Sequence, residues 1–445
     1  MNNNDFMKTK PVLPLILSMS MPMVISMLVN SLYNIVDSFF VAKISENAMT
    51  SLSLVFPVQN FINSIAVGFG VGINAVISYF LGAKKKEQAD NAASIGMLFS
   101  ILHGILMIFI CNLIMPSFLG MFTSDKEVIE LGLKYSRIVF SFSIFICVSL
   151  TFEKVFQAVG KMTFTMISLM SGCIVNIILD PVLIFGLGPV KSLGINGAAI
   201  ATIIGQLTTF LIYVFIYLRK DAGIKFKLRN ISFDISIIKK LYAVGIPATL
   251  NMALPSVLTS ALNAILSSFS GMYVVILGIY YKLQTFLYLP ANGLIQGMRP
   301  IIGYNYGAGE KTRVKQIYHT TLALNSIIMI FGTIICLIIP GQLMELFSTS
   351  PKTIHAGKTA LRIICLGFII STISVTASGA LEGLGMGLKS LVISLLRYVI
   401  IIIPSAFILS RFAGVYGVWN SFWIAEVITA SFSYIMVRRM FKRMP

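Results

Sequence analysis

The feature that most constrains this chain is a series of twelve apolar runs, each of about 20 residues or more, the length that crosses a bilayer as a helix. Helices are expected because backbone polar groups must be satisfied there without water. Only 11% of the residues are charged, against roughly a quarter in soluble domains. The predicted fold class is therefore all-α integral membrane, with twelve transmembrane helices. The predicted spans are about 13–41, 50–80, 93–119, 135–156, 163–186, 194–218, 240–268, 273–304, 318–341, 357–381, 389–410 and 415–437.

The basic residues are distributed unevenly between the two sides of the membrane. An even number of spans places both termini on one side. On that side, the polar stretch from Arg219 to Lys240 alone holds seven lysines and arginines, as many as all the loops of the opposite side together. This excess predicts a multi-pass protein of the cell membrane with both termini in the cytoplasm. The net charge of +18 is then expected to meet anionic membrane lipids, and not nucleic acid.

The two halves of the chain resemble each other. Ser20-Met21-Pro22 recurs as Gly245-Ile246-Pro247, and Gly82-Ala83 recurs as Gly307-Ala308 at the same offset along the chain. Six spans in each half give the halves the same topology, so their pseudo-twofold axis should run along the membrane normal. We therefore expect two pseudo-symmetric six-helix lobes, residues 1–225 and 226–445.

A single carboxylate stands inside the apolar run at about 163–186. Asp180 follows Asn176 by four residues, so both side chains lie on one face of a helix. Pro181 lacks a backbone N–H and leaves the carbonyl of Ile177 free one turn earlier. An ionisable residue within a membrane span is costly, so this group is a predicted functional site.

Two further polar stripes lie in other spans of the first half. Their members are Asn30, Tyr33, Asn34 and Asp37 in the first span and Thr202, Gln206 and Thr209 in the sixth. Such faces must meet protein or water, not lipid. The seventh span contains no acidic residue, and the tenth contains none before Glu382. The chemistry is therefore expected to be asymmetric although the scaffold is duplicated.

The two carboxylates, Asp37 and Asp180, lie within membrane spans, where they can bind and release a cation. Desolvation and mutual repulsion favour their neutral form, so the pair could take up a proton on one side and release it on the other. With oxygens of Asn176 and Thr202, the same group could hold a sodium ion, which prefers hard oxygen ligands. A static hydrogen-bonded contact between helices is the structural alternative.

The other ionisable residues of the spans give weaker evidence for a functional site. Arg397 and Glu426 lie in neighbouring spans and form either an ion pair or separate sites. Glu153, Lys154 and Glu382 lie near span ends, where a loop or snorkelling role is expected. The sequence has no phosphate loop and no nucleophile–base or metal-ligand spacing, so we expect neither an enzyme nor a cofactor.

Taken together, these residues resemble the multidrug and toxic compound extrusion (MATE) transporters, in particular the MepA-like bacterial branch. The resemblance covers essentially the whole chain. It rests on the order and spacing of Met21-Pro22, Asp37, the two Gly-Ala pairs, Asn176-x3-Asp180-Pro181 and Gly197-Ala198-Ala199-Ile200-Ala201-Thr202. It implies a V-shaped pair of lobes that alternates between inward- and outward-facing states. It also implies efflux of organic, often cationic, drugs in exchange for protons or sodium.

The resemblance further implies roles for individual residues. Related transporters build a cation site from an aspartate of the first span, an asparagine and an aspartate of the fifth, and a threonine of the sixth. The matching residues are Asp37, Asn176, Asp180 and Thr202. Bending of the first span points to Pro22 as a gate, and Pro181 is a second candidate. A monomer is implied, with no cofactor apart from the coupling ion, a proton or sodium.

The substrate cleft is expected to be large, apolar and sparsely polar. Candidate polar groups for it are Tyr33, Asn34, Gln59, Asn63, Gln206 and Gln284. The main alternative is a flippase for a lipid-linked or other amphipathic precursor, whose cleft should carry several basic residues. Only Lys282 and Arg299 are candidates for that role, so the antiporter is preferred. A non-transporting membrane scaffold is a third alternative.

Overall fold

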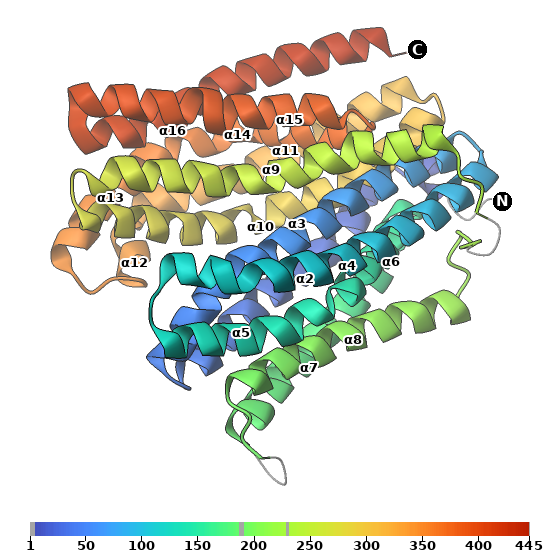
Figure 1. The fold of residues 1–445 in the computed structure, drawn as a ribbon. Coiled ribbons are helices and arrows are strands. Elements are labelled where there is room, and N and C mark those ends of the chain that lie inside the picture. Colours follow the sequence, from blue (N-terminus) through green and yellow to red (C-terminus); the bar gives the residue numbers. More distant parts are fainter. Residues whose placement is uncertain (1–4, 187–190, 228–230, 445) are drawn as a thin grey trace.

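The computed structural model describes residues 5–186, 191–227 and 231–444, and these ranges are almost entirely helical (Figure 1). The helices are α1 (Phe6–Thr9), α2 (Val12–Ala42), α3 (Glu46–Gly82), α4 (Lys86–Phe122), α5 (Lys126–Ser141), α6 (Ser143–Ala158), α7 (Met162–Phe185), α8 (Ile195–Arg219), α9 (Ile235–Ser267), α10 (Gly271–Gly307), α11 (Lys311–Ile338), α12 (Pro340–Glu345), α13 (Pro351–Ile364), α14 (Leu366–Gly383), α15 (Gly387–Leu395), a π-helical segment (Leu396–Ile402) and α16 (Ile403–Arg443).

Ten helices of the described ranges are long and apolar enough to cross a membrane, or eleven when the bent pair α5 and α6 counts as one span, and dividing the run from Gly387 to Arg443 at Gly414 gives twelve. Eight are single helices: α2, α3, α4 and α7 to α11. The fourth span is α5 with α6, bent by 46° at Phe142, and the tenth is α13 with α14, interrupted at Cys365. The last two spans share the run from Gly387 to Arg443, which is divided at Gly414 by a non-helical φ of 56° and ψ of −139°. The prediction of an all-α membrane fold is confirmed.

The duplication extends to local structure. Ser45 caps α3 and Ser270 caps α10, each accepting a backbone N–H at its side-chain oxygen, which stabilises the first turn. The turns that follow the same two helices contain positive φ angles at Lys84 (59°) and Gly309 (75°). Ser45 and Ser270 are as far apart in the sequence as Pro22 and Pro247, and so are Lys84 and Gly309. The two lobes therefore repeat the same pair of helices with the same turn after the first one.

Glycines let the lobes touch backbone to backbone. Gly72 of α3 packs on the backbone of α9 at Leu241, and its repeat counterpart Gly297 of α10 packs on the backbone of α2 at Ser20. Residues without a side chain allow helices in membranes to approach this closely. These contacts lie in the halves of the helices nearest the chain termini. We call this end, where Figure 1 shows both N and C, the terminal end; it is the narrow end of the V.

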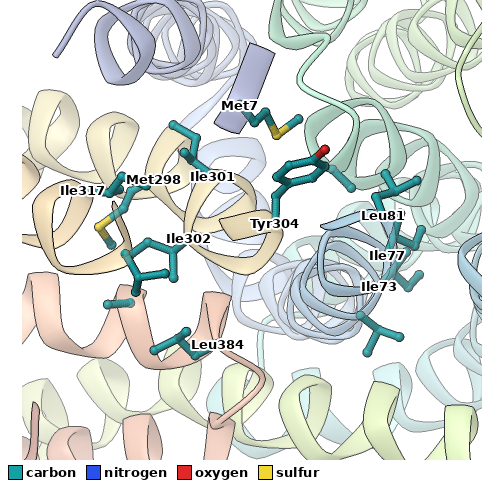
Figure 2. Packing of buried hydrophobic residues seen from close by; sticks show 14 of the residues in the cluster. Met7, Ile73, Ile77, Leu81, Met298, Ile301, Ile302, Tyr304, Ile317 and Leu384 are labelled. Atoms are coloured by element: carbon teal, nitrogen blue, oxygen red, sulfur yellow. The ribbon is translucent and has the colours of Figure 1, made fainter. Parts of the chain in front are cut away.

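A buried apolar cluster joins the lobes at the terminal end. Met7, from the short helix α1, is fully buried in the same cluster as Ile73 of α3 and Ile301 of α10 (Figure 2). Its carbonyl accepts hydrogen bonds from Asn305 (3.0 Å) and Arg313 (3.2 Å). Each such apolar side chain contributes about 1.5–3 kcal/mol when fully buried, so this cluster stabilises the closed terminal end.

The expectation of a loop or snorkelling role for Glu153, Lys154 and Glu382 is wrong. All three are buried, and Lys154 donates to Glu153 (2.7 Å) and to Gln157 (3.1 Å). The aliphatic part of Lys154 lies over Gly70 of α3, where a side chain would collide with it. Burial is tolerated because each charge has an opposite charge and hydrogen bonds beside it.

Candidate functional site

Helices α2, α7 and α8 bring the four predicted cation-site residues into one cluster. Helix α7 packs along α8, and α2 packs on α7. Asp37, Asn176 and Thr202 are almost fully buried, and Asp180 is completely buried. The carboxylates of Asp37 and Asp180 are close enough to repel each other. The arrangement therefore places two acidic groups, an amide and a hydroxyl together inside the N-terminal lobe.

A close crossing of α7 and α8 holds this cluster. A Cβ atom at Gly205 would lie 2.8 Å from the carbonyl oxygen of Gly172 and 3.0 Å from Cβ of Asn176. At Gly172, it would overlap the Thr209 hydroxyl. The two glycines thus set the distance at which Asn176 faces α8.

Gly172→Ala is expected to destabilise the protein by about 1–3 kcal/mol, because the added methyl group must push α7 away from α8. The midpoint of thermal unfolding of the purified protein measures the loss. Gly120→Ala in α4 is the matched control, since nothing lies within 4 Å of its Cβ position and alanine favours a helix over glycine. Equal stability of the two variants would contradict the close crossing.

Two tyrosines complete the cluster. Tyr33 of α2, predicted as a cleft residue, and Tyr135 of α5 both place their phenols near the Thr202 hydroxyl and within electrostatic range of Asp37. Tyr135 is buried and was not predicted. It reaches the cluster because α5 packs on α8, a tertiary contact that leaves no local sequence signal.

Several polar atoms of the cluster have no hydrogen-bond partner among the residues that the structure describes. They are Oδ1 of Asp37, both carboxylate oxygens of Asp180, Oδ1 and Nδ2 of Asn176 and Oγ1 of Thr202. Buried polar groups are normally paired, which argues against a static hydrogen-bonded contact. A proton on a carboxylate, or a sodium ion among these oxygens, would satisfy them.

The donor set favours a hard cation. No group of three or more His, Cys, Asp and Glu side chains gathers anywhere in the three described ranges, so a zinc-type site is not formed there.

Asp180 lies five residues before the end of α7 at Phe185, or roughly 8 Å at the helical rise per residue. The cluster is therefore nearer the open end of the V than the terminal end.

The remaining predicted residues are spread over four helices. Asn34 of α2 is exposed and donates to the Asn30 carbonyl (2.7 Å). The other candidates are half-buried: Gln59 and Asn63 on α3, Gln206 on α8 and Gln284 on α10. Helices α2 and α7 continue through Pro22 and Pro181. Contact with substrate and a bending role for the prolines stay predictions.

A duplicated, two-lobed membrane protein with one buried acidic cluster has the architecture of a secondary transporter. The MatE family model matches residues 22–182 and 247–408, and the starts of these two segments are separated by the offset of the internal repeat. The chain belongs to this family of transporters.

Full-length relatives agree with this assignment. Multidrug export protein MepA of Staphylococcus haemolyticus (strain JCSC1435) is 26% identical over 426 residues, covering 96% of this chain and 93% of that protein. MepA of Staphylococcus aureus (strain MRSA252) is 25% identical over 433 residues, covering 97% and 95%. A solved outward-facing multidrug resistance MATE family transporter of the MOP superfamily has the same fold, with a TM-score of 0.93, 24% identity and coverage of 100% and 99%.

Proposed function

We propose that this chain is a multidrug efflux antiporter, which exports organic, often cationic, drugs in exchange for protons or sodium by alternating access. The observation that carries the proposal is the buried pair Asp37 and Asp180: Oδ1 of Asp37 and both carboxylate oxygens of Asp180 have no hydrogen-bond partner within the described chain. The names of the MepA relatives support drug export as the activity.

The charge of the cluster can couple the inward movement of a proton or sodium ion to the export of an organic cation. When a proton or sodium ion binds, it removes the repulsion between Asp37 and Asp180 and the cost of their burial. When the cation leaves, the acidic cluster regains its attraction for an organic cation. Each state of the cluster thus favours a different occupant, and a coupled exchange requires such a difference.

We infer that the closed terminal end faces the cytoplasm. The support is the excess of lysine and arginine in the loops of that side. On this orientation the structure is outward-facing, with the acidic cluster near the outer surface.

The lobes are residues 1–225 and 226–445, which divide between α8 and α9, and we propose that the protein works as a monomer. Pro22 and Pro181 are the proposed bend points of α2 and α7.

A flippase is less well supported. The two basic residues considered for a pyrophosphate are both engaged: Arg299 lies 2.5 Å from Glu382, and Lys282 lies over the ring of Phe347 at 5.6 Å. A lipid-linked anion would therefore have to compete with contacts already made.

Ethidium transport in reconstituted vesicles tests the proposal. We expect a proton gradient or a sodium gradient, each imposed alone, to drive ethidium against its own gradient. Movement with the proton gradient alone identifies the pair as a protonation switch, and movement with sodium alone makes Asn176 and Thr202 direct ligands. If neither gradient moves ethidium, the antiport proposal is wrong and lipid-linked substrates should be tested.

A further inference from the structure

A cavity of about 260 Å³ lies at the terminal end of the C-terminal lobe, away from the acidic cluster. Its lining comes from the last turns of α16, the start of α15 and Tyr306 near the end of α10. Figure 1 shows these turns of α16 next to the C-terminus. Helix α15 packs mainly on α9 and only lightly on α16. A gap therefore remains between α15 and α16, and the cavity lies in this gap.

The lining contains three basic side chains and no acidic one. Lys389, Arg439 and Arg443 all line the cavity, and all three are exposed. None of them forms an ion pair with a residue of the described ranges. Glu382, which precedes α15, is already paired with Arg299 at 2.5 Å. Three positive charges are therefore accessible at this cavity and are not neutralised by the described chain.

One face of α16 changes from apolar to basic along the cavity. Phe432, Ile435 and Met436 come first, inside the predicted last span at 415–437. Arg439 and Arg443 follow about one and two turns later, and this spacing keeps them on the same face. Phe432 and Ile435 are exposed, as expected for side chains that meet lipid tails. The face therefore places apolar groups beside basic groups at the membrane boundary, in the order of the acyl chains and the phosphate of a phospholipid.

The basic groups suit a phosphate. A guanidinium group is a planar fork of donors that matches two phosphate oxygens, and an ammonium group adds a point charge. Nζ of Lys389 lies 3.6 Å from Sδ of Met386, which is only a weak acceptor. Basic pockets between membrane helices on the cytoplasmic side bind acidic lipid head groups. Flexible side chains that can adapt to the glycerol part of a lipid complete the lining: Met386, Met436, Met440 and Met444.

We propose that this cavity binds the phosphate of one anionic phospholipid, whose acyl chains run along Phe432 and Ile435. The assignment of this lipid to the inner leaflet rests on the orientation proposed above. The binding itself requires only that the cavity meets the membrane surface. A zwitterionic phospholipid brings its own ammonium group, which the three basic side chains repel, so it should bind more weakly.

Native mass spectrometry of the purified full-length protein can count bound lipids and measure their affinities. The protein is titrated in detergent with dioleoyl phosphatidylglycerol and, separately, with dioleoyl phosphatidylcholine, which has the same acyl chains. We expect one phosphatidylglycerol molecule to bind with an affinity about tenfold higher than phosphatidylcholine, the typical effect of one charge-assisted hydrogen bond.

Three variants decide whether the cavity is responsible. Arg439→Gln/Arg443→Gln should bind the two lipids with equal affinity. Arg438→Gln/Lys442→Gln is the matched control, because it removes two exposed charges from the same turns of α16 that do not line the cavity; it should keep the tenfold preference. Lys389→Gln, on α15, should reduce the preference without changing α16. All five side chains are exposed, so each variant is expected to fold.

Three results would overturn the proposal. The first is equal affinity for the two lipids in the parent protein. The second is an equal loss of preference in the two double variants, which would mean that surface charge alone attracts the lipid. The third is displacement of phosphatidylglycerol by an equal concentration of glycerol 3-phosphate, which would mean that the site binds a soluble phosphate. Because the titration needs no ion gradient, each of these results leaves the efflux proposal standing, and a failure of ethidium transport leaves the lipid site standing.

Discussion

Asp180→Asn is expected to reduce gradient-driven ethidium efflux to the level of vesicles without the protein. Asparagine has nearly the same shape as aspartate, but it cannot exchange a proton and is a weaker ligand for sodium. Asp180 is completely buried and none of its oxygens is paired within the described residues, so the substitution breaks no contact. The folded protein should therefore be at least as stable as the parent, because a buried charge is removed.

Asp125→Asn is the matched control for this experiment. Asp125 lies in the same lobe and caps α5 through Glu127 and Val128, and asparagine caps a helix equally well. Efflux by this variant should equal that of the parent. If Asp180→Asn also transported ethidium at the parental rate, the cluster would be structural and the assignment of the site wrong.

Gly307→Val is expected to prevent the terminal end from closing and to abolish efflux. A side chain at Gly307 would overlap the carbonyl oxygen of Tyr79, and its repeat counterpart Gly82 faces Tyr304 in the same way. Overlaps of this kind cost about 2 kcal/mol or more, which shifts a two-state equilibrium by roughly 30-fold. The cost arises only while the lobes touch, so the outward-facing state loses population.

Distances between spin labels measure this shift. Labels at Lys85 and Thr312, exposed positions beside the two contacts, should move apart in Gly307→Val. Gly271→Val on the same helix is the control, because nothing lies within 4 Å of its Cβ position. An unchanged distance distribution in Gly307→Val would show that the glycine contacts do not hold the terminal end closed.

Apolar length and helical spacing were sufficient to predict the spans and part of the cluster. Asn176 and Asp180 are four residues apart, and the structure keeps both buried on α7. The position of Asp37 beside them followed from the family resemblance, since spacing within one span cannot place another. The structure supports it because α2 packs on α7.

Contacts between distant segments explain what the sequence could not predict. The bend at Phe142 has no proline or glycine to mark it. Tyr135 joins the cluster only through the packing of α5 on α8. The sequence left open whether Arg397 and Glu426 form an ion pair. In the structure they do, because their helices pack side by side. Local patterns predict helices and their polar faces, whereas partners across helices depend on the whole fold.

Cation release on drug binding tests the central claim most directly. Tetraphenylphosphonium is added to purified protein in weakly buffered solution, and a pH indicator, or radioactive sodium in a parallel experiment, measures what leaves the protein. The account predicts release of about one cation for each drug bound, with no release from Asp37→Asn/Asp180→Asn. Drug binding without release of a proton or sodium, with the same heat in parent and variant, would contradict it.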